Sequence, residues 1–123
     1  MGNLRVTELR AFIPALDFER SKQFYQELGF TMDWEAGELA YFHFDGQCCF
    51  LLQDFNQPAF ATNFMMHMVV EDVDAWLQRV HESGVAEKYD VRVGAIESQP
   101  WGMRDFVLYD PAGVLWRIGA DEE

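Results

Sequence analysis

A chain of 123 residues can bury one hydrophobic core but is too short to build two independent domains. Half of its residues are apolar and eleven are Phe, a supply that can fill a core and also line a pocket. The 21 acidic residues against 9 basic ones give a formal net charge of −12. Such a charge argues against nucleic-acid and membrane-surface partners, because both are negatively charged. It either attracts cationic ligands or serves solubility alone.

The first half of the chain shows strand and helix signals in the order β-α-β-β-β. A strand is predicted over residues 5–15, with Pro14 at its end or edge because proline has no amide proton to donate. Asp17 is the predicted N-cap of a helix that ends at Gly29, since apolar residues recur between them at helical spacing. Further strands are predicted over residues 31–35, 39–44 and 48–53, with turns at 36–38 and 45–46, and residues 54–63 are predicted as a loop.

The second half repeats this order. A strand predicted over residues 64–70 leads to Asp72, the predicted N-cap of a helix that ends at Gly84. Trp76 lies on the apolar stripe of this helix and is therefore assigned to the core. The remaining strands are predicted over residues 91–96, 103–109 and 114–119, with a loop at 97–102 and a turn at 110–113.

The two Asp-to-Gly stretches have equal length and lie 55 residues apart, which indicates one supersecondary unit used twice. We therefore predict an α+β fold in which two tandem βαβββ modules form curved mixed sheets around a cleft. The modules span about residues 5–53 and 64–119 of a single domain over residues 1–123. Two similar halves around a cleft favour a small-molecule site.

The cysteines and the apolar runs bear on the cellular compartment. Cys48 and Cys49 are neighbours on a predicted strand and point to opposite faces, so a disulfide between them would be strained. They are interpreted as reduced thiols. The N-terminus lacks the apolar region of a signal peptide, and no apolar run approaches about 20 residues. These features predict a cytoplasmic protein without a membrane span.

Several short motifs occur in an order that is specific as a set. They are residues 17–25 (DFERSKQFY) after Pro14, 28–30 (LGF), 70–73 (VEDV), 99–104 (QPWGMR) and 110–113 (DPAG) leading into 115–117 (LWR). With the paired modules, this order resembles the vicinal oxygen chelate superfamily, which includes glyoxalase I, extradiol dioxygenases, and the fosfomycin and bleomycin resistance proteins. The resemblance covers nearly the whole chain and implies the fold, but the scaffold hosts several chemistries.

In metal-dependent members of that superfamily, four His, Glu or Gln side chains on the first and last strands of the modules hold a divalent ion. Carried over one at a time, these positions fall on Ala11, Met65, Arg117 and either Leu52 or Gln53. Three of the four hold residues that cannot bind such an ion, and Arg117 would repel it. The resemblance therefore implies a relative without the shared metal site, and no cofactor is predicted.

Without that metal site, the chain is most similar to the bleomycin-resistance type, which it resembles in length, acidic balance and the placing of Pro14 and Trp101. This resemblance implies a homodimer that sequesters a cationic, aromatic antibiotic without catalysing a reaction. Aromatic rings stack on planar ligands and hold cations over their faces. The candidate ligand-binding residues are Trp34, Phe42, Phe44, Phe50, His67, Trp101 and Arg117.

Several of these residues have a structural alternative. The three Phe residues can equally be core residues, and Trp116 is assigned to the core. His67 either lines a pocket or, with His43 nearby, acts as a relocated metal ligand or general base. Arg117 either pairs with an inward carboxylate such as Glu8 or holds an anionic part of a ligand.

Two other functions stay open on the sequence alone. One is a metal-dependent lyase, isomerase or dioxygenase of the same fold, with a displaced metal site near His67. The other is the binding of an unidentified metabolite or a protein partner, with no role in resistance. Under the first interpretation, a drug-binding protein, no residue is catalytic.

Overall fold

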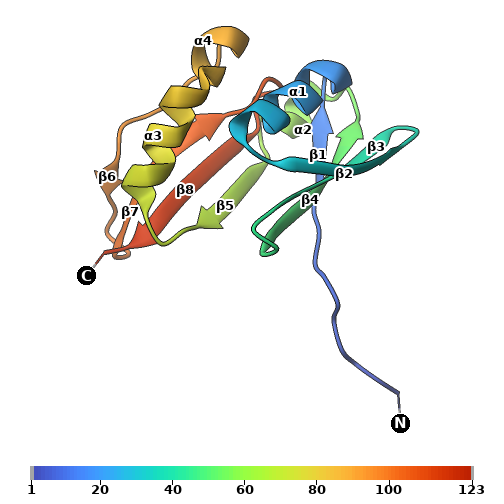
Figure 1. Ribbon diagram of the computed structural model, residues 1–123, viewed down its shortest axis with the longest axis horizontal. Coiled ribbons are helices and arrows are strands. Elements are labelled where there is room, and N and C mark those ends of the chain that lie inside the picture. The colour runs from blue at the N-terminus through green and yellow to red at the C-terminus, as the bar shows by residue number, and fades with distance from the viewer. Residues whose placement is uncertain (1, 123) are drawn as a thin grey trace.

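The structure, a computed structural model, describes residues 2–122 and consists of two halves built on the same plan (Figure 1). The first half contains β1 (Phe12–Ala15), α1 (Phe18–Leu28), β2 (Thr31–Ala36), β3 (Leu39–Phe44) and β4 (Cys48–Asp54). A short helix, α2 (Pro58–Ala61), leads to β5 (Met65–Val69), α3 (Val73–Ser83), α4 (Val85–Tyr89), β6 (Glu97–Ser98), β7 (Met103–Tyr109) and β8 (Leu115–Asp121). The predicted α+β fold with two βαβββ modules is confirmed.

Each half forms one four-stranded mixed sheet, in the orders β1-β4-β3-β2 and β5-β8-β7-β6. The first strand of each half pairs in parallel with the last strand of the same half, with Ile13 opposite Leu52 and Met68 opposite Ile118. The other strand pairs are antiparallel. Pro14 lies on β1 at the edge of its sheet, as predicted, where a missing amide proton is tolerated.

The two long helices begin in the same way, as the Asp-to-Gly repeat predicts. Asp17 Oδ1 accepts a hydrogen bond from the backbone N–H of Arg20 at 3.1 Å. Asp72 Oδ1 accepts one from the backbone N–H of Ala75 at 3.0 Å. Each carboxylate thereby satisfies an amide of the first turn that has no partner within its helix, so both helices start at the predicted residues.

The end of α1 is joined to α3 across the two modules. Gly29 follows α1 with φ 122°, a conformation that favours glycine. A Cβ at this position would overlap the guanidinium of Arg79 on α3, whose Nε donates to the carbonyl of Leu28 at 3.0 Å. A cation at the C-terminal end of a helix interacts favourably with its free carbonyls, so this contact stabilises the packing of one module on the other.

Two strand predictions are wrong. The strand predicted over residues 5–15 is reduced to β1, because residues 2–10 run away from the sheet as an extended arm with no strand beside it in the described chain (Figure 1). The strand predicted over residues 91–96 is reduced to an isolated bridge between Val93 and Leu108. Residues 91–96 pack apolar side chains on the core, but their backbone hydrogen-bonds to β7 only at isolated points. Their apolar alternation is therefore not accompanied by a continuous ladder of hydrogen bonds between strands.

Some elements are missing from the sequence-based prediction. Helices of four or five residues, such as α2 and α4, do not show a full helical period, and β6 lies in a segment predicted as a loop.

Within residues 2–122, no helix combines the length and the apolar character that crossing a membrane requires.

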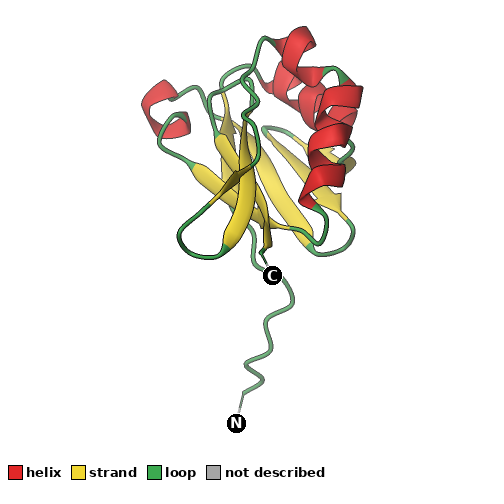
Figure 2. Cartoon of the chain, turned by 90° about the vertical axis from the view of Figure 1, so that its left-hand side faces the viewer, coloured by secondary structure: helices red, strands yellow, loops and turns green. Residues whose placement is uncertain are grey.

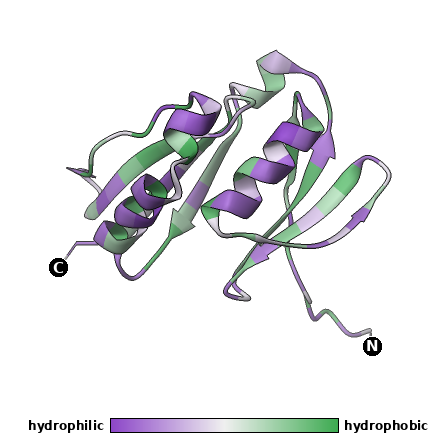
Figure 3. Cartoon of the chain, turned by 45° about the horizontal axis from the view of Figure 1, so that its top comes forward, coloured by the Kyte–Doolittle hydropathy of each residue, from purple (hydrophilic) through white to green (hydrophobic). Residues whose placement is uncertain are grey.

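Helices α1, α3 and α4 lie together on one side of the two sheets (Figure 2). Polar residues dominate the outward surfaces of α1 and α3, while the strands beneath them carry most of the apolar residues (Figure 3). We call the opposite side of the two sheets the open face. Side chains alternate along a strand, so the open face carries the residues between the core positions of β3, β4, β5 and β8. Each candidate ligand-binding residue on a strand therefore lies either on the core side or on the open face.

The core residues of the two modules meet at Tyr25, which lies on α1 and contacts both modules. Its ring is fully buried and lies 4.9 Å from the ring of Phe50 and 5.8 Å from that of Trp116. Its hydroxyl donates to Asp110 Oδ2 at 2.6 Å and accepts from Trp116 Nε1 at 2.9 Å. Asp110 and Trp116 belong to the second module, so this network fixes how the two halves pack.

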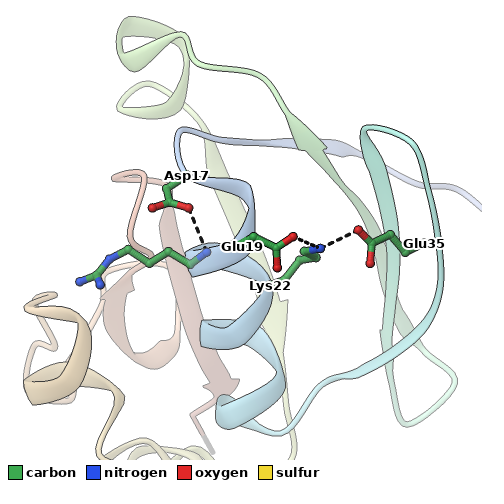
Figure 4. A network of polar contacts seen from close by, with 5 residues as sticks. Asp17, Glu19, Lys22 and Glu35 are labelled. Carbon is green, nitrogen blue, oxygen red and sulfur yellow. Dashed lines mark hydrogen bonds and ion pairs between the residues drawn. The ribbon is translucent and has the colours of Figure 1, made fainter.

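A buried cation attaches α1 to β2 (Figure 4). Lys22 is 5% exposed, and its Nζ lies 2.6 Å from both Glu19 Oε1 and Glu35 Oε2. Burial lowers the pKa of Lys22, but the two carboxylates outweigh it and hold this pKa above its ordinary value. The ammonium also lies 4.5 Å from the ring centre of Phe18, so the charge has three partners.

Glu35→Gln is expected to lower the free energy of unfolding by about 1 kcal/mol, because Glu35 is partly exposed and solvent weakens its pair with Lys22. Urea denaturation of both proteins measures this difference. Glu38→Gln, which removes the same charge from an exposed turn residue, is the matched control and should leave the stability unchanged. An equal loss in both variants would mean that net charge, not the buried pair, is responsible.

Candidate functional site

A cleft runs between the two modules, where the β3–β4 hairpin faces β5 and the start of α3. It consists of two adjoining pockets of about 220 and 500 Å³. Gln47, Cys48, Met68 and Val69 line both pockets, so the two lie side by side. A cleft of this size can hold much of a drug-sized molecule. We call it the inter-module cleft.

The larger pocket combines aromatic rings with carboxylates. The rings of Phe44 and Trp76 lie 4.9 Å apart, edge to face, and both line it. Asp45, Glu71 and Asp72 are exposed residues that line the same pocket, Asp45 from the first module and the other two from the second. Rings and carboxylates together suit a ligand that is both planar and positively charged.

A cation already lies over this ring pair. The guanidinium carbon of Arg79 is 5.6 Å from the ring centre of Phe44 and 6.0 Å from that of Trp76. Arg79 contacts the rings from α3, outside the larger pocket. The Phe44–Trp76 ring pair therefore already has one cation–π partner within the protein, on the side away from the larger pocket.

The smaller pocket reaches the open face at Cys49 and His67. His67 is exposed on β5 and lies opposite Arg117 on β8. The Arg117 guanidinium forms two 3.1 Å contacts with the carboxylate of Asp105, which is 2% exposed. Arg117 thus pairs with an inward carboxylate, one of the two alternatives drawn from the sequence, but this carboxylate is Asp105 on the adjacent strand β7. It is not Glu8, which contacts Arg10 and Tyr41 instead.

Trp101 completes this group of residues. Its ring is 58% exposed and lies 5.9 Å from the guanidinium carbon of Arg117. The structure thus brings together three of the residues singled out in the sequence, namely His67, Arg117 and Trp101, on the open face of the second sheet. Because Asp105 neutralises Arg117, the group formed by His67, Arg117 and Trp101 presents a flat aromatic surface with little net charge.

Trp34 lies on the other sheet, in a separate aromatic stack. Its ring is 41% exposed and stacks on Tyr41 at 5.8 Å, and Tyr41 stacks on His43 at 6.0 Å. The Tyr41 hydroxyl donates to Glu8 Oε2 at 2.8 Å, and this bond raises the pKa of Tyr41 to about 12. His43 pairs with Cys49 across the sheet, so the stack reaches the rim of the smaller pocket.

The three predicted Phe residues lie in two different environments. Phe42 and Phe50 are fully buried and stack on each other at 5.4 Å on the core side of the first sheet, so neither can touch a ligand. Phe44 is half-buried and lines the larger pocket. Of the two tryptophans assigned to the core, Trp116 is 2% exposed, whereas Trp76 is half-buried and also faces the cleft.

Sequence reasoning misses the carboxylates of the cleft. Asp45 follows β3 directly and Glu71 follows β5 by two residues, so they lie 26 residues apart in the chain. The signal available in the sequence is that each acidic residue lies just after a strand, one strand in each module. Only the packing of the modules shows that these strand ends face the same cleft.

The divalent-metal site of the resembled family does not fit these residues. Leu52 is buried on the core side, so the fourth position falls on Gln53 of the open face. The set is then Ala11, Met65, Gln53 and Arg117, with one neutral oxygen donor and one cation already paired with Asp105. Nor do residues 2–122 contain a group of three His, Cys, Asp or Glu side chains placed to hold an ion, around His67 or elsewhere.

Comparisons with known proteins agree with this geometry. A family model described as Glyoxalase/Bleomycin resistance protein/Dioxygenase superfamily matches residues 9–118. No curated protein matches the chain in sequence. A crystal structure of a bleomycin-binding protein complexed with bleomycin is similar, with a TM-score of 0.80 and 23% identity over 95% of this chain and 100% of that one.

Two further solved structures show how widely the fold is used. The bleomycin-binding protein from bleomycin-producing Streptomyces verticillus, complexed with copper(II)-bleomycin, has a TM-score of 0.73 and 22% identity over 97% of this chain and 99% of that one. Lactoylglutathione lyase from Agrobacterium tumefaciens has a TM-score of 0.67 and 20% identity over 94% of this chain and 95% of that one. At these identities the likeness establishes the fold and leaves the function to the site.

Proposed function

Because the chain belongs to the Glyoxalase/Bleomycin resistance protein/Dioxygenase superfamily, whose scaffold serves both binding and catalysis, we propose from the site that it is a binding protein. It sequesters a cationic, aromatic, antibiotic-like small molecule in the inter-module cleft, without a metal ion. The observation that carries this proposal is the juxtaposition of exposed carboxylates, Asp45 and Glu71, with the Phe44–Trp76 ring pair in one cleft.

The charge of the whole molecule supports the same ligand class. A net charge of −12 attracts a cation over several ångströms and speeds its encounter with the cleft. Planar rings then stack against Phe44 and Trp76, while Asp45 and Glu71 neutralise the positive group. The exposed aromatic group at Trp101, beside His67 and Arg117, offers further surface to a ligand larger than the cleft.

We further propose that the protein is a cytoplasmic homodimer. The arm, residues 2–10, exposes Leu4, Val6 and Leu9 by 93, 80 and 87% of their surface, and apolar residues so exposed are commonly covered by a partner. The open face adds Met65 and Val69, exposed by 58 and 59%. The two free thiols suit a reducing compartment.

The test is a tryptophan-fluorescence titration with metal-free bleomycin, chosen because a similar structure is described as complexed with bleomycin. Trp76 lies in the cleft, so binding should quench the emission with a dissociation constant in the micromolar range or below. The affinity should fall as salt is raised, since salt screens the carboxylates. If the emission does not change when the protein concentration is more than about ten times this dissociation constant, the drug-binding proposal is contradicted.

A pair of double variants tests whether the cleft itself attracts the cation. Asp45→Asn with Glu71→Gln is expected to weaken bleomycin binding about tenfold at low salt, because two carboxylates near the bound charge are lost. Glu38→Gln with Glu87→Gln removes the same charge at exposed positions outside the cleft and should leave the affinity unchanged. Equal weakening in both double variants would show that net charge acts at long range and that the cleft is not the site.

A further inference from the structure

Three sulfur-containing residues, drawn from both modules, lie where the modules meet, along the smaller pocket of the inter-module cleft. Cys48 lies on β4 and Met66 and Met68 lie on β5, and all three side chains line the smaller pocket. The Cys48 Sγ is 3.8 Å from the Met68 Sδ. A thiol and two thioethers from different modules thus border one solvent-connected volume of about 220 Å³.

The strands explain why these side chains meet. Cys48 is on the same side of β4 as Phe50 and Leu52, and Met66 and Met68 are on the same side of β5, opposite Trp116 and Ile118 of β8. That side faces the core, and β1 does not extend beside Cys48, so β5 is the strand that approaches this end of β4. Cys49 points the other way, toward the arm.

From this juxtaposition we propose that Cys48, Met66 and Met68 form a binding site for one soft monovalent cation of the copper(I) class. Thiolate and thioether sulfurs are the ligands that select copper(I), whereas nitrogen and oxygen donors are needed for harder ions. Residues 2–122 offer no cluster of three His, Cys, Asp or Glu ligands, so the same place does not suit a divalent ion held by nitrogen and oxygen.

The observed sulfur spacing fits a bridging ion. At a metal–sulfur distance of about 2.3 Å, two sulfurs 3.8 Å apart subtend an angle of about 110° at the ion. An angle of that size leaves space for a third ligand, and Met66 lines the same pocket on the same side of β5. Methionine side chains are flexible enough to complete such a site without moving the backbone.

The charge balance also favours this ion. Binding forms the bond between copper and the Cys48 Sγ, breaks the S–H bond and releases one proton to water. The resulting pair of thiolate and monovalent cation is neutral, as a half-buried site requires.

The sulfur site adjoins the proposed drug site, because Cys48 and Met68 line both pockets. The two sites use different groups, since copper(I) is held by sulfurs whereas the drug is held by the carboxylates and rings of the larger pocket. Each ligand is titrated separately, so a failure of copper binding is distinguished from a failure of bleomycin binding.

The experiment is an anaerobic titration of copper(I) into the reduced protein in competition with the chromophoric chelator bicinchoninate. We expect one equivalent of copper(I) per chain. Cys48→Ser should weaken binding at least about 100-fold and Met68→Leu at least about tenfold, since each removes one ligand of the ion.

Matched variants separate this site from adventitious thiol binding. Cys49→Ser and Met65→Leu change the neighbouring cysteine and an exposed methionine on the open face, and both should bind copper(I) like the original protein. Near-ultraviolet circular dichroism checks that Cys48→Ser remains folded, and Met68→Leu tests the site without removing a thiol. Binding that is absent, that survives both ligand-site variants, or that is lost in Cys49→Ser overturns the proposal.

Discussion

Tyr25→Phe is expected to lower the free energy of unfolding by about 3 kcal/mol at neutral pH, because two buried polar groups lose their partner. The substitution removes one oxygen atom and keeps the ring that packs against Phe50 and Trp116. The expected loss therefore comes from hydrogen bonds and not from a cavity.

The size of this effect follows from what is left behind. Asp110 Oδ1 still accepts from the backbone N–H groups of Ala112 and Val114, each at 2.9 Å, but Oδ2 loses the Tyr25 hydroxyl. The indole N–H of Trp116 also loses its acceptor, and both residues are 2% exposed. A buried group without a partner costs its full desolvation free energy, and a charged one costs more than a neutral one.

The effect should depend on pH, and its sign is fixed by Asp110. Burial raises the pKa of Asp110 to about 6, against an unfolded value near 3.8, while the Tyr25 hydrogen bond acts in the opposite direction. The contribution of Asp110 to stability is therefore fully present below about pH 3.8 and is lost as the pH rises through about 6. Tyr25→Phe raises this pKa further, so its destabilisation should be larger at pH 8 than at pH 5.

Urea denaturation of the original protein and of Tyr25→Phe at pH 5 and pH 8 measures both effects. Tyr109→Phe is the matched control, because its hydroxyl accepts only a 3.3 Å bond from Arg92 at the surface. This control should change the free energy of unfolding by less than about 0.5 kcal/mol at either pH. A Tyr25→Phe loss as small as that of the control would mean that the buried network does not join the modules.

The helices were predictable because their signals are local. Asp17 and Asp72 each cap a helix through a hydrogen bond three residues away, and Gly29 and Gly84 each supply the conformation that ends one. None of these contacts depends on a distant part of the chain. The two βαβββ modules could thus be predicted in outline from the repeat alone.

The candidate site was harder to predict, because it depends on contacts between residues distant in sequence. Alternation alone could not show that Phe42 and Phe50 face the core while Phe44, on the same side of its strand, lies at the cleft. That difference arises because Phe44 is the last residue of β3 and packs against Trp76 of α3, where the two modules meet. Likewise, charge alone suggests Glu8 as a partner of Arg117. The register of β7 and β8 instead places Val107 opposite Arg117 and Asp105 diagonally beside it, within reach of the guanidinium.

The strand predicted over residues 5–15 was wrong for a reason that bears on assembly. Residues 5–10 have strand-like alternation, but the described chain has no free edge beside them. A segment with strand character and exposed aliphatic side chains is suited to pairing with another chain. The proposed homodimer accounts for this pattern, because a partner chain can pair with the arm and cover its aliphatic side chains.

Deleting residues 2–7 is expected to weaken the proposed homodimer about 100-fold. The deletion removes Leu4 and Val6, which are 93 and 80% exposed in the single chain. Covering two such side chains contributes about 3 kcal/mol, and this corresponds to about two orders of magnitude in the dissociation constant. The deletion keeps Glu8 and Arg10, whose contacts with Tyr41 attach the arm to its own module.

Sedimentation velocity at a series of protein concentrations measures the dimer dissociation constant. Thr7→Ala is the matched control, because it alters the arm without removing an aliphatic side chain, and it should leave this constant unchanged. The same truncated protein also tests where the drug binds. Asp45, Glu71, Phe44 and Trp76 come from one chain, so bleomycin affinity should survive the loss of the dimer. If dimer and affinity are lost together, the ligand lies between two chains, and the cleft within one chain does not suffice to bind it.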